Sequence, residues 1–176
     1  MASDSAAPPQ VTLLSRVTLD YSPDEDRMKL TGLTQTGSLV VAWLTLRLLG
    51  RVVPHLLTRY ESIAASAVSN TAPLQQSSQP EVLGGAGAEE PVLPAHDTPC
   101  FLVGAADITQ GTDSIILTLR GGSNEVRFAI PASKMAQWLS GVKNLYQVAE
   151  WPMLAWKDAN QILMSSEGGG GSVTLH

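Results

Sequence analysis

Four side chains that carry or can carry positive charge recur every four residues in the first half of the chain. They are Arg47, Arg51, His55 and Arg59. On a helix, residues four apart lie along one face, so this spacing predicts a single cationic strip. One interpretation is a solvated face opposite the hydrophobic core. The other is a docking strip for an acidic partner or a phosphate backbone.

Residues for nucleophilic catalysis are poorly placed in this sequence. Such catalysis needs a nucleophile and an oriented base, and the three histidines are His55, His96 and His176. We expect the segments around His96 and His176 to be flexible, and we expect Cys100 to be a small buried hydrophobic residue. Gly121 and the glycine after it fit no phosphate-binding pattern. We therefore predict no enzyme activity, no catalytic residue and no bound cofactor.

An acidic cluster lies between the first two predicted strands. Its members are Asp20, Asp24, Glu25 and Asp26. Calcium-binding loops place oxygen ligands at alternating positions and add a glycine and a distal glutamate, and this stretch has neither in place. Its composition is that of an ordinary turn. We therefore predict no metal site.

The most apolar stretch, Val40–Leu57, is predicted to contain a strand followed by a core helix. β-Branched and aromatic residues favour a strand over Ser38–Leu44, and Thr45 is a candidate N-cap. Apolar residues then recur at three- and four-residue steps, which predicts a helix to about Ala67 with a kink or interruption at Pro54. A membrane span is disfavoured because arginines, a glycine and a proline interrupt the stretch.

Two segments, which start at Asp20 and Asp107, share a pattern when they are shifted by 87 positions. Each passes from an Asp-containing loop through a strand, a Gly-containing turn and another strand into a helix, and a strand precedes each loop. The strands with clear limits are Val11–Leu19, Arg27–Leu33, Phe101–Asp107 and Ser114–Leu119. We predict an α+β fold of two βββα units, with curved antiparallel sheets that are each packed by one helix.

Composition divides the chain into five parts. We predict a disordered N-terminus over 1–10, a first βββα unit over 11–69, a flexible linker over 70–99, a second βββα unit over 100–164 and a flexible tail over 165–176. The second helix is predicted to run from Ala132 to about Val148, and 153–164 is expected to form a last strand or hairpin. We expect Trp43, Trp138 and Trp151 to lie in or near the core.

Bulk composition is that of an ordinary globular protein. The 176 residues carry a net charge of −5, and 44% of them are apolar. This net negative charge disfavours a protein dedicated to binding duplex DNA, which usually carries a basic face. A single cysteine cannot form an internal disulfide, and the first residues have neither the basic nor the apolar region of a secretory signal. We therefore expect a cytoplasmic protein.

Two resemblances to known families add to these expectations. Glu25–Leu30 (EDRMKL) and Trp43–Leu49 (WLTLRLL) are similar to a group of small uncharacterised bacterial proteins, and this resemblance implies no activity. The predicted units are similar in topology to PUR-repeat and Whirly single-stranded nucleic-acid binders, which bind with basic and aromatic residues on an exposed sheet face. The residues that this resemblance assigns to such a face are the strand cations Arg27, Lys29, Arg120 and Arg127.

These observations together predict a non-enzymatic accessory protein that binds a protein partner or associates with itself. Its partner-binding residues are the four members of the cationic strip. The alternative is a single-stranded nucleic-acid-binding protein of PUR-like or Whirly-like architecture, which binds with the four strand cations. A third alternative is reversible association of the helix over 45–60 with a membrane surface.

Overall fold

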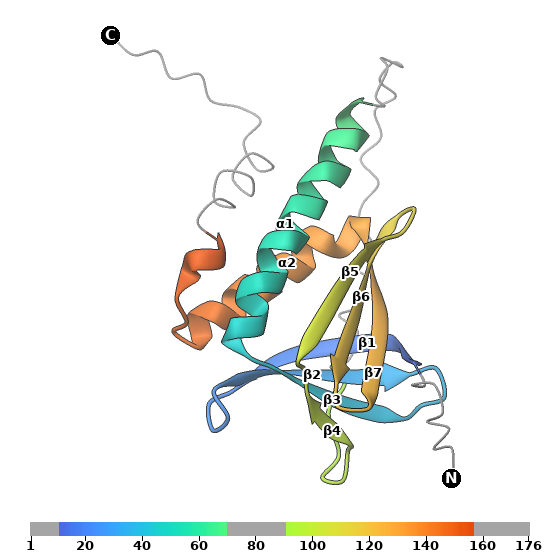
Figure 1. The fold of residues 1–176 in the computed structure, drawn as a ribbon, viewed down its shortest axis with the longest axis vertical. Coiled ribbons are helices and arrows are strands. Elements are labelled where there is room, and N and C mark those ends of the chain that lie inside the picture. Colours follow the sequence, from blue (N-terminus) through green and yellow to red (C-terminus); the bar gives the residue numbers. More distant parts are fainter. Residues whose placement is uncertain (1–10, 70–90, 157–176) are drawn as a thin grey trace, which may run out of the picture.

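The computed structural model describes residues 11–69 and 91–156 (Figure 1). The elements in chain order are β1 (Val11–Ser22), β2 (Arg27–Thr34), β3 (Leu39–Leu44), α1 (Leu46–Ser69), β4 (Cys100–Leu102), β5 (Ala105–Gln110), β6 (Ser114–Gly121), β7 (Asn124–Pro131), α2 (Ala132–Val148) and the 3-10 helix η1 (Met153–Trp156). The strands form a mixed sheet that packs against the two α-helices, so the predicted α+β class is confirmed.

The strands of the described residues form one sheet in the order β4-β3-β2-β1-β7-β6-β5. Neighbours are antiparallel except for the pairs β1 with β7 and β3 with β4, which are parallel. β4 and β5 are the two outermost strands of the sheet, and only Val103 and Gly104 separate them in the chain. The two ends of the curved sheet are therefore joined at this two-residue corner (Figure 1). At this corner the Val103 amide donates to the Trp43 carbonyl oxygen (3.0 Å), and the Gly104 amide donates to the Arg120 carbonyl oxygen (2.8 Å).

The predicted arrangement, in which each βββα unit has its own antiparallel sheet or shares one with the other unit, is matched only in part, because the strands form one mixed sheet. The first strand of each half pairs in parallel with the last strand of the other half, β1 with β7 and β4 with β3. A separate three-stranded sheet would leave the backbone groups of its outer strands unpaired, and these parallel pairs satisfy part of them. The strand predicted over Phe101–Asp107 is divided for the same reason: 100–102 pairs with β3, whereas 105–110 pairs with β6.

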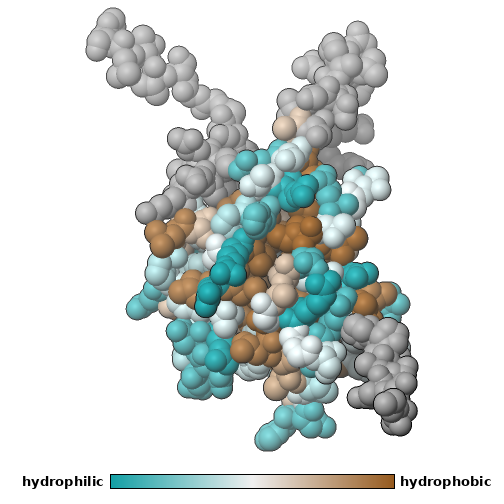
Figure 2. Space-filling model, viewed as in Figure 1, coloured by the Kyte–Doolittle hydropathy of each residue, from teal (hydrophilic) through white to brown (hydrophobic). Residues whose placement is uncertain are grey.

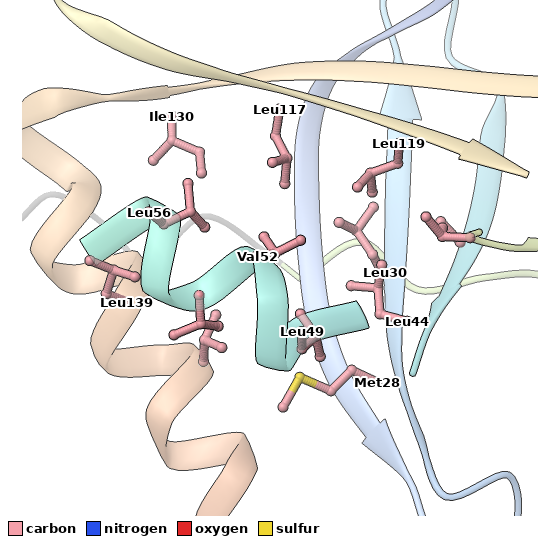
Figure 3. Close-up of a cluster of buried hydrophobic side chains, with 14 of the residues drawn as sticks. Met28, Leu30, Leu44, Leu49, Val52, Leu56, Leu117, Leu119, Ile130 and Leu139 are labelled. Carbon is pink, nitrogen blue, oxygen red and sulfur yellow. The ribbon is translucent and has the colours of Figure 1, made fainter. Parts of the chain in front are cut away.

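One face of the curved sheet forms a single hydrophobic core with both α-helices (Figure 3). Strand residues alternate between the two faces, so in β2 the side chains of Met28 and Leu30 are buried whereas Lys29 points to the other face. Helix α1 contributes Val52 and Leu56 between the strands and α2. Full burial of one such side chain stabilises the fold by about 1.5–3 kcal/mol, which makes this core the main stabilising element.

Helix α1 begins as the sequence predicts. The hydroxyl oxygen of Thr45 accepts a hydrogen bond from the Leu48 amide (3.2 Å), which confirms Thr45 as the N-cap. The helix then continues through Pro54 to Ser69, so the predicted interruption does not occur. The buried side chains around the proline offset the one backbone hydrogen bond that it removes. No helix within 11–69 or 91–156 combines the length and apolarity that a membrane crossing needs.

Part of the segment predicted as a linker lies against the sheet. Val92 is buried, and its amide donates to the hydroxyl oxygen of Thr18 in β1 (2.9 Å). The Val41 amide of β3 donates to the carbonyl oxygen of Pro99 (2.8 Å). Residues 91–99 therefore lead along the outside of the sheet into β4, while 1–10, 70–90, 157–164 and the predicted tail lie outside the described residues.

The last described segment is helical, so the prediction of a strand over Met153–Trp156 is wrong. Trp156 is buried, and its ring meets the Tyr146 ring edge to face at a centroid distance of 5.8 Å. Trp151 meets the same Tyr146 ring edge to face at 5.4 Å. A single helical turn brings both tryptophans to one tyrosine, whereas an extended strand would carry Trp156 away from it.

Candidate functional site

The cationic strip predicted from the sequence lies on the exposed face of α1. Arg47, Arg51, His55 and Arg59 are all exposed, and they alternate with the buried residues that face the core. Twelve residues of helix separate the first from the last, which corresponds to about 18 Å. Figure 2 shows this face as a hydrophilic band along α1 with hydrophobic side chains beside it.

A groove of about 300 Å³ separates the middle of the strip from β5. Arg51 and His55 line it from the helix, and Ala106 and Ile108 line it from the strand. β5 is the last strand in the sheet order, so one of its edges has no strand neighbour among the residues that the structure describes. Near the end of this edge, Arg59 Nη1 donates to Gln110 Oε1 across the groove (3.3 Å). The strip therefore forms the cationic rim of a partly apolar groove beside an edge strand.

The charges of the strip are available for an external partner. In the described part of the chain, Arg47, Arg51 and His55 form neither an ion pair nor a side-chain hydrogen bond. Arg59 has an amide partner only, which leaves its positive charge uncompensated. An acidic segment that binds along α1 would therefore have no resident carboxylate to displace.

The four strand cations are placed differently, because each of them lies beside a carboxylate. On β2, Arg27 pairs with Glu25 (3.3 Å) and Lys29 pairs with Asp20 (3.5 Å). Arg27 and Lys29 form one group on β2. The second group lies on the other side of β1 and consists of Arg120 on β6 and Arg127 on β7. Trp43 is the cross-strand neighbour of Lys29, and it is half-buried.

Glu125 connects the second group of strand cations. Arg120 Nε donates to Glu125 Oε2 (2.8 Å), and the Arg120 guanidinium also pairs with Asp107. Arg127 Nη2 lies 3.5 Å from Glu125 Oε1. The hydrogen bond that Arg120 donates to Glu125, followed by the one that it donates to Asp107, raises the pKa of Arg120 above its ordinary value. A nucleic acid that contacts this group would compete with both carboxylates for the guanidinium groups.

The other residues considered for chemistry are not assembled into a site. His96 is exposed in the segment 91–99, and His176 lies outside the described residues. Cys100 is exposed at the start of β4, so the prediction that it is buried is wrong. Its position on the outward face of an outer strand explains the exposure, since its neighbour Phe101 occupies the inward position.

Asp26 of the acidic cluster has a structural role. It adopts a positive φ of 46° in the turn between β1 and β2. Its Oδ1 accepts hydrogen bonds from the indole Nε1 of Trp151 (2.8 Å) and from the hydroxyl of Tyr21 (2.8 Å). These two bonds, with that from Trp151 the stronger cause, hold the pKa of Asp26 below its ordinary value. Asp26 therefore ties the β1–β2 turn to the end of the described chain.

We expect Asp26→Ala to lower the melting temperature by roughly 3–10 °C, because the largely buried indole N–H of Trp151 loses its acceptor. Asp24→Ala, in the same turn and exposed, is the matched control and should leave the melting temperature unchanged. Thermal unfolding followed by circular dichroism measures both. Equal melting temperatures for wild type and Asp26→Ala would contradict the structural role.

The same contact has a pH dependence of defined sign. Because the folded-state pKa of Asp26 is lowered, its carboxylate stabilises the fold above the ordinary carboxyl pKa of about 4. This stabilisation is lost as the pH falls through the lowered value. Asp26→Asn keeps an acceptor oxygen but does not titrate, so it should reduce the fall of the melting temperature in acid. An equal fall of the melting temperature in acid for the wild type and Asp26→Asn would contradict this assignment.

Sequence reasoning missed a second groove, which lies where β1 and β7 separate. Arg16, Lys134 and Trp138 line it, and they come from β1 and α2. Lys134 and Trp138 are four residues apart on one helix face, which is visible in the sequence. No sequence pattern brings Arg16 beside them, because this contact depends on the parallel pairing of β1 with β7.

Comparisons of the chain with models of protein families, with curated proteins and with solved structures each found no match.

Proposed function

We propose that this protein is a non-enzymatic interaction protein that binds an acidic segment of a protein partner along α1. The observation that carries this proposal is the contrast between two sets of cations. Arg47, Arg51 and His55 form no ion pair within the described ranges, whereas all four strand cations do. Positive charge is therefore available along α1, which a partner's carboxylates can reach without breaking an internal ion pair.

The groove beside the strip favours a polypeptide over a bare polyanion. Its walls include the apolar side chains of Leu48, Val52 and Ile108 next to Arg51 and His55. An extended segment with alternating acidic and apolar side chains would place one set on the strip and the other in the groove. A second copy of this acidic chain is another source of such a segment, which keeps self-association within the proposal.

The experiment uses a fluorescently labelled peptide of alternating glutamate and leucine, titrated with the full chain at low salt. Neutralising the strip in the triple variant Arg47→Gln, Arg51→Gln, Arg59→Gln should weaken binding at least about tenfold, because each charge-assisted contact is worth more than about 1 kcal/mol. Fluorescence anisotropy measures the dissociation constants. Light scattering on the protein alone shows whether the same substitutions also change its oligomeric state.

The matched control changes the net charge by the same amount at another helix face. Ser140→Glu, Asn144→Glu and Gln147→Glu add three negative charges to exposed positions of α2. This variant should bind the peptide like the wild type, apart from a small long-range effect that salt removes. Equal losses in the two triple variants would show that only net charge matters and would contradict a docking strip on α1.

The alternative function, single-stranded nucleic-acid binding, is tested in the same titration with a labelled oligothymidine. The four strand cations would then carry binding, with a steep loss as salt increases. Their ion pairs argue against this alternative, because each phosphate contact would replace an existing carboxylate contact. Oligothymidine binding that disappears in Arg27→Gln, Lys29→Gln but persists in the strip variant would favour the alternative over our proposal.

We also propose that the two halves of the chain are related βββα units and that the protein acts in the cytoplasm. Support for related units comes from the strand limits, since β2 and β6 both contain eight residues and begin 87 positions apart. Each half also ends its last strand at the start of an α-helix. Support for the cytoplasm comes from the single cysteine, which is a free thiol.

A further inference from the structure

The second groove lies where β1 leaves β7. The two strands pair only from Val11 to Leu13, and β1 then bulges between Leu14 and Arg16 and continues along β2. β7 continues along β6 and leads directly into α2. The space that opens between β1, β7 and α2 has a volume of about 390 Å³, within the range of small-molecule sites.

Two N–H groups of residues that line this groove lack acceptors. Arg16 Nε and the indole Nε1 of Trp138 are both buried, and neither has a hydrogen-bond partner in the described part of the chain. A buried donor without an acceptor costs about 1–3 kcal/mol, and more when the group is charged. Both donors belong to residues that line the same groove, so a ligand bound there would lie beside both side chains.

The remaining lining favours an anion with an apolar body. Lys134 adds a second positive charge at an exposed position, and none of the described residues that line the groove is Asp or Glu. The walls between the polar groups are apolar and include Val17, Phe128 and Ile130. The groove therefore combines two cations, an indole donor and hydrophobic walls in a chain whose net charge is −5.

We propose that this groove binds a small carboxylic acid with an aromatic or aliphatic body. One carboxylate oxygen accepts from Arg16 Nε and the other from Trp138 Nε1, while Lys134 screens the charge from the rim. A guanidinium binds carboxylate and phosphate oxygens alike, and the apolar walls of the groove favour an organic acid over inorganic phosphate. The apolar body lies against Val17, Phe128 and Ile130. A rotation of the Arg16 or Trp138 side chain turns its N–H toward the ligand.

The test is a titration of the ¹⁵N-labelled full chain with phenylacetate, followed by the indole Nε1–H signals of the tryptophans. The Trp138 signal is assigned by its absence in Trp138→Phe. At roughly millimolar phenylacetate we expect a downfield shift of the Trp138 signal and of the Arg16 Nε–H signal, with the other indole signals unchanged. Phenylacetamide, which has the same body without the charge, should produce no such shift.

Variants show which residues carry the binding. Arg16→Gln should weaken phenylacetate binding at least about tenfold, and Trp138→Phe should weaken it by about fivefold, because Phe keeps the apolar wall but removes the donor. Arg51→Gln, on the strip of α1, is the control and should bind phenylacetate like the wild type. The same spectra show that each variant is folded. Because the two surfaces share no residue, the proposed partner-binding function and this site can fail independently.

Three outcomes would overturn the inference. The first is the absence of any shift of the Trp138 signal with phenylacetate. The second is an equal shift with phenylacetamide, which would show that the groove binds apolar bodies without using its donors. The third is a shift with inorganic phosphate but not with phenylacetate, which would assign the donors to an oxyanion without an apolar body.

Discussion

Gly121→Ala is expected to destabilise the protein by about 3 kcal/mol or more. Gly121 ends β6 at the corner where β4 leads into β5. A β-carbon at this position would overlap the backbone carbonyl oxygen of Leu102 and lie 2.8 Å from the ring of Phe101. The carbonyl cannot move aside, because its strand is held by the pairing of β4 with β3. The corner that joins the two ends of the sheet must therefore open.

The matched control for this prediction lies in the same corner. A β-carbon on Gly104 would meet no atom within 4 Å, and Gly104 is exposed. Gly104→Ala should therefore change stability by less than about 1 kcal/mol, through the unfolded chain alone. Urea unfolding followed by tryptophan fluorescence gives both free energies of unfolding. Similar values for the two variants would show that the close approach at Gly121 does not hold the corner together.

The elements of the fold follow from the sequence, but their arrangement does not. Alternation of apolar residues locates β2 and β6, and helical spacing locates α1 and α2, because these patterns depend on residues that are close in the chain. The parallel pairs join strands from different halves, and no local pattern distinguishes them from open edges. Gly121 illustrates the limit, since the sequence presents it as a turn glycine whereas its close contact is with β4.

The same distinction applies to the candidate sites, because some follow from local sequence spacing and others depend on contacts between distant parts of the chain. The strip on α1 is predictable because four-residue spacing and helix geometry place its members together whatever the rest of the chain does. The ion pair between Arg120 and Asp107 joins two strands, so its existence depends on their register. The groove around Arg16 and Trp138 requires both the bulge in β1 and the path of α2. Sequence alone therefore overestimates the free charge on the strands and misses the second groove.

Trp156→Ala is expected to lower the free energy of unfolding by about 3–5 kcal/mol, the usual range for removing a fully buried tryptophan side chain. Only 1% of the Trp156 surface is exposed, although the residue belongs to the last described turn of the chain. Its ring packs edge to face against Tyr146, which in turn packs against Trp151. Removing it takes away the anchor of η1 and one wall of the core beside α2.

A neighbouring substitution separates packing from hydrogen bonding in this cluster. The hydroxyl of Tyr146 is buried and has no hydrogen-bond partner in the described residues, and burial raises the pKa of Tyr146 to about 12. Tyr146→Phe keeps the ring contacts and removes the unpaired hydroxyl, so it should be neutral or stabilising. Urea unfolding should then show a large decrease in the free energy of unfolding for Trp156→Ala and no decrease for Tyr146→Phe. A loss below about 1 kcal/mol for Trp156→Ala would mean that η1 does not stay docked on the helices in solution, whereas the expected loss would make residues 153–156 part of the folded core.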